Sequence, residues 1–181
     1  MEQRKRARRS VALWTIACAG ALSAAADAGT LEIPMHAVEA NGVGARIGTV
    51  RVEDGAKGLL FDVELERMPP GEHGFHIHEH ADCGAKAQDG TMTAAAAAGG
   101  HYDPRKTGRH AGPTGAGHLG DLPAIKADGE GRVNAQVLAP RLKISDLKGR
   151  SLMVHAGGDN YADDPKPLGG GGARIACGSI G

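Results

Sequence analysis

Seven short stretches of apolar and β-branched residues, separated by turn residues and by two long tracts without a hydrophobic pattern, constrain the fold most. Their lengths and alternation are typical of strands rather than helices. Only five aromatic residues accompany 29 glycines, so the core must rest on Val, Ile, Leu, Met and Ala, and the composition argues against a helix bundle. The strand-like stretches are residues 31–38, 45–52, 59–65, 74–79, 132–138, 151–156 and 173–176.

Tight-turn dipeptides connect the first three stretches. Asn41-Gly42 and Asp54-Gly55 predict two turns and hence an antiparallel meander. The patternless tracts, residues 81–122 and 157–172, predict long functional loops, and the alanine run 94–98 is interpreted as loop because two glycines follow it. Many short strands with long excursions indicate an all-β antiparallel barrel or sandwich in a single domain.

The first 28 residues have the three-part layout of a secretory signal. A basic stretch precedes an apolar run at 11–22 and a small-residue tract at 23–28, which predicts cleavage after Ala26 or Ala28. The apolar run is too short for a stable membrane span. Lipidation at Cys18, after Thr15-Ile16-Ala17, is an alternative. We therefore expect residues 29–181 to form the mature domain in the periplasm.

Export would also account for the cysteines. Cys18 leaves with the signal, and Cys83 and Cys177 remain as an even pair in an oxidising compartment. A disulfide is expected, with two free buried thiols as the alternative. Removing the signal deletes five basic and two acidic residues, so the mature chain is mildly acidic. No excess of Lys and Arg exists to neutralise phosphates, which argues against nucleic acid as a partner.

Nine histidines need an explanation. His76 and His78 alternate in a strand-like stretch, so both side chains should point to one face, about 7 Å apart, within reach of one metal ion. His80 continues the alternation near the strand end. A His-x-His pair alone is weak evidence for a site.

A stronger signal follows in the first tract. His101, His110, His118 and Asp121 supply three imidazoles and one carboxylate, a donor set that suits a closed tetrahedral zinc site. The tract has almost no apolar residues to order it without a metal. His155 ends an apolar strand; with His76, His78 and a shared loop histidine it would complete four nitrogens for Cu(II).

Several blocks in this order resemble the copper/zinc superoxide dismutases, in particular their bacterial periplasmic branch. The resemblance covers residues 31–181. Its motifs are Gly74-Phe75-His76-Ile77-His78, Asp82-Cys83, the series from His101-Tyr102-Asp103-Pro104 to Asp121, the segment from His155 to Tyr161, and the segment from Gly170 to Gly178.

The resemblance implies an eight-stranded Greek-key antiparallel barrel, a sandwich of immunoglobulin-like type, with two long functional loops holding the metals outside it. It implies one copper and one zinc per subunit, in a monomer or a homodimer. Copper would be bound by His76, His78, His101 and His155. Zinc would be bound by His101, His110, His118 and Asp121, so that His101 bridges the two metals.

Further roles follow from the same resemblance. Asp159 matches the carboxylate that links His76 to His110 and fixes their orientation. Cys83 and Cys177 match the intrasubunit disulfide, and Arg174 matches the arginine that guides the anion to copper. The implied reaction is disproportionation of superoxide to dioxygen and hydrogen peroxide, with copper cycling between Cu(II) and Cu(I) and His101 donating a proton. His36, His73 and His80 have no assigned role.

Three other functions would use part of this pattern. A copper carrier with the same fold would need neither a bridging His101 nor an anion-guiding Arg174. A zinc hydrolase of the His-x-His-x-Asp-His type is excluded because Glu79-His80-Ala81-Asp82 follows His78. A phosphate-binding role for residues 169–172 fails because no Lys-Ser or Lys-Thr follows and the glycines precede a strand.

Overall fold

The structure is a computed structural model that describes residues 30–181. The expected signal at 1–28, its cleavage sites at Ala26 and Ala28, and Cys18 lie outside the described residues. Within residues 30–181, no helix has the length and apolar content to cross a membrane.

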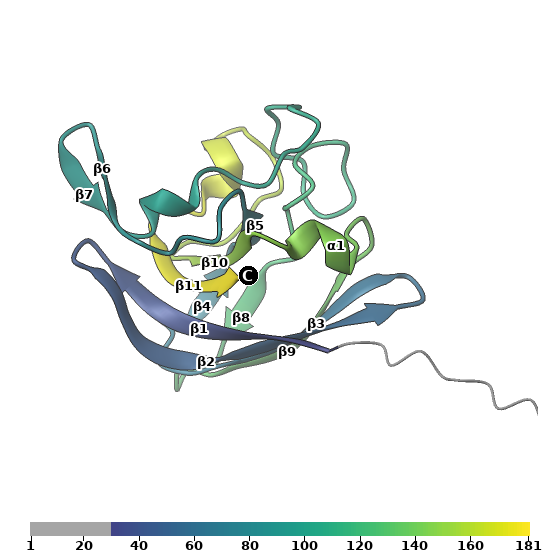
Figure 1. The fold of residues 1–181 in the computed structure, drawn as a ribbon, viewed down its shortest axis with the longest axis horizontal. Helices are drawn as coiled ribbons and strands as arrows, with labels where there is room; N and C mark the ends of the chain where they lie inside the picture. Colours follow the sequence, from purple (N-terminus) through teal and green to yellow (C-terminus); the bar gives the residue numbers. More distant parts are fainter. Residues whose placement is uncertain (1–29) are drawn as a thin grey trace, which may run out of the picture.

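A curved antiparallel sheet of seven strands forms most of the fold (Figure 1). Its strand order is β5-β10-β11-β1-β2-β3-β9. The bounds are β1 Leu31–Glu39, β2 Gly42–Gly55, β3 Gly58–Leu65, β5 Phe75–His78, β9 Val133–Ala139, β10 Arg150–His155 and β11 Arg174–Ile180.

Two further short strands close this sheet into a barrel. β4 (Gly71–His73) precedes β5 with Gly74 between them, and it pairs with β8 (Ile125–Ala127). β8 turns back toward β9 at Asp128, whose N–H donates to the carbonyl of Arg132 over 2.9 Å. With β4 and β5 counted as one strand, the barrel has the eight strands and the all-β antiparallel architecture expected from the sequence.

Every strand-like stretch is a strand in the structure, but both turns are displaced. The first turn lies at Ala40 and Asn41, and Gly42 already opens β2; the second follows Gly55, the last residue of β2. Cross-strand pairing of Glu39 with Gly42 and of Gly55 with Gly58 sets these positions, so the dipeptide signal was off by one or two residues.

The first long tract contains short elements that the sequence did not predict. These are the hairpin of β6 (Lys86–Gln88) and β7 (Thr91–Thr93), and the 3₁₀ turn η1 (Ala96–Ala98). The loop interpretation of the alanine run is wrong in part, since residues 96–98 form this turn. Ala95 and Ala98 are fully buried in a small apolar cluster, which holds the turn in place. The remaining helical segments are α1 (Ile144–Leu147) and η2 (Pro167–Gly170).

The main core lies inside the barrel and is built from Val, Ile, Leu, Ala and Met, as expected. Both phenylalanines are fully buried there, and the rings of Phe61 and Phe75 meet edge to face. Phe75 and Ile77 point into this core, so His76 and His78 on the same strand must face away from it.

The disulfide between Cys83 and Cys177 is present, which confirms the sequence prediction. It joins the first long loop to β11 across 94 residues of chain. Val38, Met153, Ala95 and Ala98 pack around it as a second apolar cluster. The loop is thus fixed to the barrel beside the histidines.

Candidate metal centre

Strand β5 supplies the platform of the centre. Its register with β10 places His76 opposite Met153 and His78 opposite Ser151. The first long loop runs along the other edge of β5: Ile77 donates its N–H to the carbonyl of Gly120 over 2.9 Å and accepts the N–H of Tyr102 over 2.8 Å. These bonds bring His101 opposite His78, and Asp121 opposite His76, as single β-bridges.

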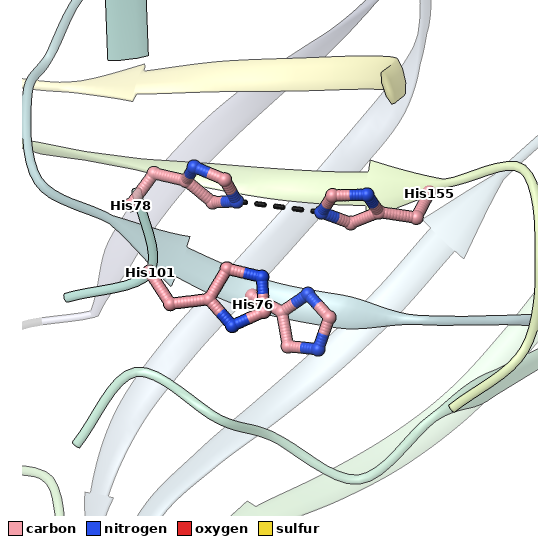
Figure 2. A group of neighbouring side chains, drawn as sticks. All are labelled: His76, His78, His101 and His155. Carbon is pink, nitrogen blue, oxygen red and sulfur yellow. Dashed lines mark hydrogen bonds between the residues drawn. The ribbon is translucent and has the colours of Figure 1, made fainter. Parts of the chain in front are cut away.

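Four buried histidines meet at the first group of ligand atoms (Figure 2). One ring nitrogen from each of His76, His78, His101 and His155 lies within 4.8 Å of the others. His155 belongs to β10 and reaches the group from beside β5. The four residues are those expected to bind copper.

The other nitrogen of each ring already has a fixed partner. Nδ1 of His78 donates to the carbonyl of Gly99 over 3.0 Å, and Nδ1 of His155 donates to the carbonyl of Gly172 over 3.1 Å. Nε2 of both rings must then be an unprotonated acceptor. These two Nε2 atoms lie 3.3 Å apart and face each other along the dashed line of Figure 2. Two lone pairs in that position need a shared cation, so the donor set fits a metal ion.

Nδ1 of His76 completes this fit. It is buried and has no hydrogen-bond partner within residues 30–181, while Nε2 of the same ring lies 2.7 Å from Oδ2 of Asp159. Orphaned ring nitrogens at the centre of a histidine cluster are free to coordinate a metal.

The second group surrounds Asp121. Its Oδ1 atom lies 3.0 Å from Nδ1 of His101, 3.1 Å from Nδ1 of His110 and 3.4 Å from Nδ1 of His118. His76, His101, His110 and Asp121 form a set whose ligand atoms lie within 4.8 Å of one another, and His118 is not a member of this set. Nδ1 of His110 and of His118 have no hydrogen-bond partner in the described chain. The three imidazoles and one carboxylate suit zinc.

Asp159 joins the two groups. Its Oδ2 accepts from Nε2 of His76 and its Oδ1 from Nε2 of His110, both over 2.7 Å; Oδ1 also accepts the N–H of Tyr161 over 2.8 Å. With Nε2 carrying the proton in both rings, Nδ1 is left as the ligand atom on each side. Asp159 thus contacts the two rings that the resemblance names for it.

Burial sets the protonation of the first group. It lowers the pKa of His76 to about 3 and of His155 to about 4, and it also lowers the pKa of His78 and of His101. Neutral imidazole is the form that binds metal, so the first group is ready at neutral pH.

The second group is charged differently. Burial lowers the pKa of His110, but the carboxylates of Asp121 and Asp159, which lie against its two ring nitrogens, outweigh burial and raise the pKa to about 9. Burial alone would raise the pKa of Asp121, yet its three histidine partners hold it far below its usual range. A metal that binds here must displace a proton from His110.

Arg174 lies beside the first group. Its Nη1 donates to the carbonyl of Ala95 and its Nη2 to the carbonyl of Gly99, both over 2.6 Å. The carbonyl of Gly99 is also the acceptor for His78, so the guanidinium and that ring share one anchor. Burial is the largest cause of the lowered pKa of His78 and of His155, and the positive charge of Arg174 lowers both pKa values further.

The three unassigned histidines have different environments. His80 is exposed, and His36 lies 3.2 Å from the carbonyl of Gly44. His73 is buried, with its ring nitrogens 2.7 Å from the carbonyls of His155 and Pro69. It therefore supports the backbone of His155.

Two other residues near the centre carried no sequence signal. Asp163 accepts the backbone N–H of His110 over 2.9 Å, and Arg141 binds backbone carbonyls of the loop that contains His110 and His118. Both act on main-chain atoms, which leave no trace in the pattern of side chains.

Comparisons with known proteins agree with this geometry. A family model described as copper/zinc superoxide dismutase (SODC) matches residues 46–180. A Cu-Zn superoxide dismutase of Escherichia coli (strain K12) is 52% identical over 156 residues, which cover 86% of this chain and 90% of that protein.

Solved structures are similar throughout the described barrel. A Cu/Zn superoxide dismutase from Brucella abortus has a TM-score of 0.83 and 49% identity. A solution structure of the monomeric copper, zinc superoxide dismutase from Salmonella enterica has a TM-score of 0.76 and 50% identity. Each comparison covers 84% of this chain and 100% of the other. The chain belongs to the copper/zinc superoxide dismutase family.

Proposed function

We propose that this chain converts two superoxide anions and two protons to dioxygen and hydrogen peroxide. The position of His101 carries the proposal. Nδ1 of this ring faces Asp121, and the ring also belongs to the group with His76, His78 and His155. His76 belongs to both groups as well, but its Nε2 is held by Asp159. His101 is therefore the imidazole placed to face both groups, which is more than metal storage requires.

The ligand sets follow from the free nitrogens. His76, His78, His101 and His155 would hold one copper, and His101, His110, His118 and Asp121 would hold one zinc. Bound copper supplies the one-electron redox change that zinc cannot provide. Asp159 keeps Nδ1 of His76 and of His110 free for these roles, because it fixes the protons on Nε2.

Arg174 would bind and orient the anion. A guanidinium has five N–H donors and stays charged at any working pH. Two donors are used on Ala95 and Gly99, which fix the group beside His78 and leave others available to a small anion. Its positive charge favours superoxide over neutral molecules.

His101 would deliver a proton. Asp121 holds the Nδ1 side of the ring over 3.0 Å, so Nε2 is the atom that can take up a proton and pass it to the reduced substrate. The ring is almost fully buried, so this proton stays out of bulk water until it is transferred.

The reaction would take place in the periplasm. The signal layout of residues 1–28 supports export, and the Cys83–Cys177 disulfide supports an oxidising compartment. The mature domain would begin at residue 27 or 29 and work as a monomer or homodimer. Mass spectrometry of the exported protein tests this; acyl chains on Cys18, or an intact N-terminus, would contradict it.

Metal content and superoxide turnover of the purified mature chain test the activity. We expect one copper and one zinc per chain and a copper d–d absorption band that superoxide bleaches. Zinc alone after reconstitution with copper would refute the redox proposal. Both metals without turnover would instead identify a metal carrier.

A further inference from the structure

The zinc loop, residues 109–118, is held in a closed ring that its own side chains do not explain. It consists of small and polar residues and contributes no member to the main apolar core. The N–H of His118 donates to the carbonyl of Arg109 over 2.9 Å and closes the ring. A Cβ on Gly117 would lie 2.2 Å from that same carbonyl, so only glycine fits the closure.

The side chain of Arg141 binds this ring from outside. It comes from the segment between β9 and α1, where its neighbour Leu142 is buried in the barrel core. Nε donates to the carbonyl of Pro113 over 2.8 Å, and Nη2 donates to that of Gly112 over 3.0 Å. The same guanidinium donates to the carbonyls of Gly117 and His118.

Four carbonyl oxygens that converge on one point repel each other unless a cation lies among them. The planar guanidinium offers five N–H donors in fixed directions, and here four contacts join both halves of the ring. Burial lowers the pKa of Arg141 and the charge of Asp121 raises it, but an arginine keeps its proton in either case. The guanidinium of Arg141 is therefore always present as a cation among the four carbonyls of the loop.

We propose that Arg141 is a positioning residue for the zinc site, which holds His110 and His118 against Asp121 before any metal binds. This inference rests on the zinc site of the proposed function. His110 follows the first residue of the ring and His118 is its last residue. The carbonyl of His118 is itself one of the four acceptors. Without Arg141, zinc binding would also have to order the ring, and affinity would fall by that cost.

The measurement is the zinc affinity of Arg141→Gln and Arg141→Lys, by competition with a chromophoric chelator on the disulfide-bonded chain. We expect Arg141→Gln to weaken zinc binding by about 10- to 100-fold, the range seen when groups behind metal ligands are removed. Arg141→Lys keeps the charge but not the planar set of N–H donors, so its zinc affinity should lie between those of the wild type and Arg141→Gln. Cobalt(II) absorption should show weakened tetrahedral bands in the glutamine variant.

Arg105→Gln is the matched control. Arg105 is exposed and lines the same 280 Å³ cavity as Arg141, and within residues 30–181 its side chain makes no hydrogen bond. The control removes the same charge close to the zinc loop, so we expect zinc affinity within about twofold of the wild type.

A purely stabilising role gives a different result. It would lower the melting temperature equally with and without zinc, whereas a positioning residue lowers the increase in melting temperature that zinc produces, because that increase depends on affinity. Equal losses of melting temperature with and without zinc, or a folded Arg141→Gln with wild-type zinc affinity, would overturn this inference but not the zinc site. If Arg141→Gln does not fold, the increase in melting temperature that zinc produces in Arg141→Lys decides the question. A wild-type chain that binds no zinc would overturn the zinc site as well.

Discussion

Replacement of Asp159 by asparagine tests how the two ligand groups are coupled. The carboxylate accepts hydrogen bonds from Nε2 of His76 on one oxygen and from Nε2 of His110 on the other. An amide has a single oxygen and presents an NH₂ group on its other side. In Asp159→Asn one of the two rings therefore faces a donor, must carry its proton on Nδ1, and loses the nitrogen that would bind metal.

The magnitude follows from the bond that is lost. A hydrogen bond to a charged group contributes about 1.5 to 3 kcal/mol, which corresponds to about 10- to 100-fold in affinity. Divalent copper binds nitrogen sites more tightly than zinc does. We therefore expect copper content to survive after stoichiometric loading, while zinc affinity falls by about 10- to 100-fold.

Chelator competition for zinc and elemental analysis for copper are the assays. Asp164→Asn is the matched control, because Asp164 is an exposed carboxylate of the same loop and its side chain makes no hydrogen bond within residues 30–181. The control should change zinc affinity by less than about threefold. Wild-type zinc affinity in Asp159→Asn, or an equal loss in both variants, would refute the reasoning from tautomers.

Three further outcomes are expected. Arg174→Ala should keep both metals, lose about tenfold or more in turnover and show a flatter dependence of rate on ionic strength; an unchanged dependence would remove Arg174 from the site. Reduction of Cys83–Cys177 should lower the melting temperature, since chain entropy sets an upper value of about 4 to 5 kcal/mol for this loop, and an unchanged temperature would contradict that contribution. The metal-free chain should lose stability as pH falls from about 6.5 to about 4. Burial lowers the folded pKa values of His76 and His155 to about 3 and about 4, so over this range the unfolded chain binds more protons. His110, with its pKa raised to about 9, stays protonated in the folded chain, so it opposes this loss only near pH 6.5, where the unfolded chain is still taking up its proton. A constant urea midpoint between pH 6.5 and 4 would contradict the argument.

Much of the fold could be predicted because strand formation follows from local patterns. Each strand-like stretch became a strand, and His76 and His78 share a face since side chains alternate along β5. The turns at residues 40–41 and after Gly55 were misplaced by a residue or two. Their positions depend on pairing across the sheet, which acts at a longer range than a dipeptide.

The sequence by itself determined which side chains could form the centre. The types and spacing of the histidines, Asp121 and the cysteine pair are covalent facts of the chain, and they indicated two metals and one disulfide. It did not indicate the supports of the centre, namely Arg141 on the zinc loop and His73 behind His155.

Only the tertiary structure decided which nitrogen of each ring is free. That choice depends on the acceptor behind the ring: Gly99 for His78, Gly172 for His155 and Asp159 for His76. Two of these acceptors are backbone carbonyls, which every residue has and no sequence pattern marks. They reach the rings only because the barrel and the disulfide bring distant segments together, so the folded chain, and not the sequence pattern, orients the ligands.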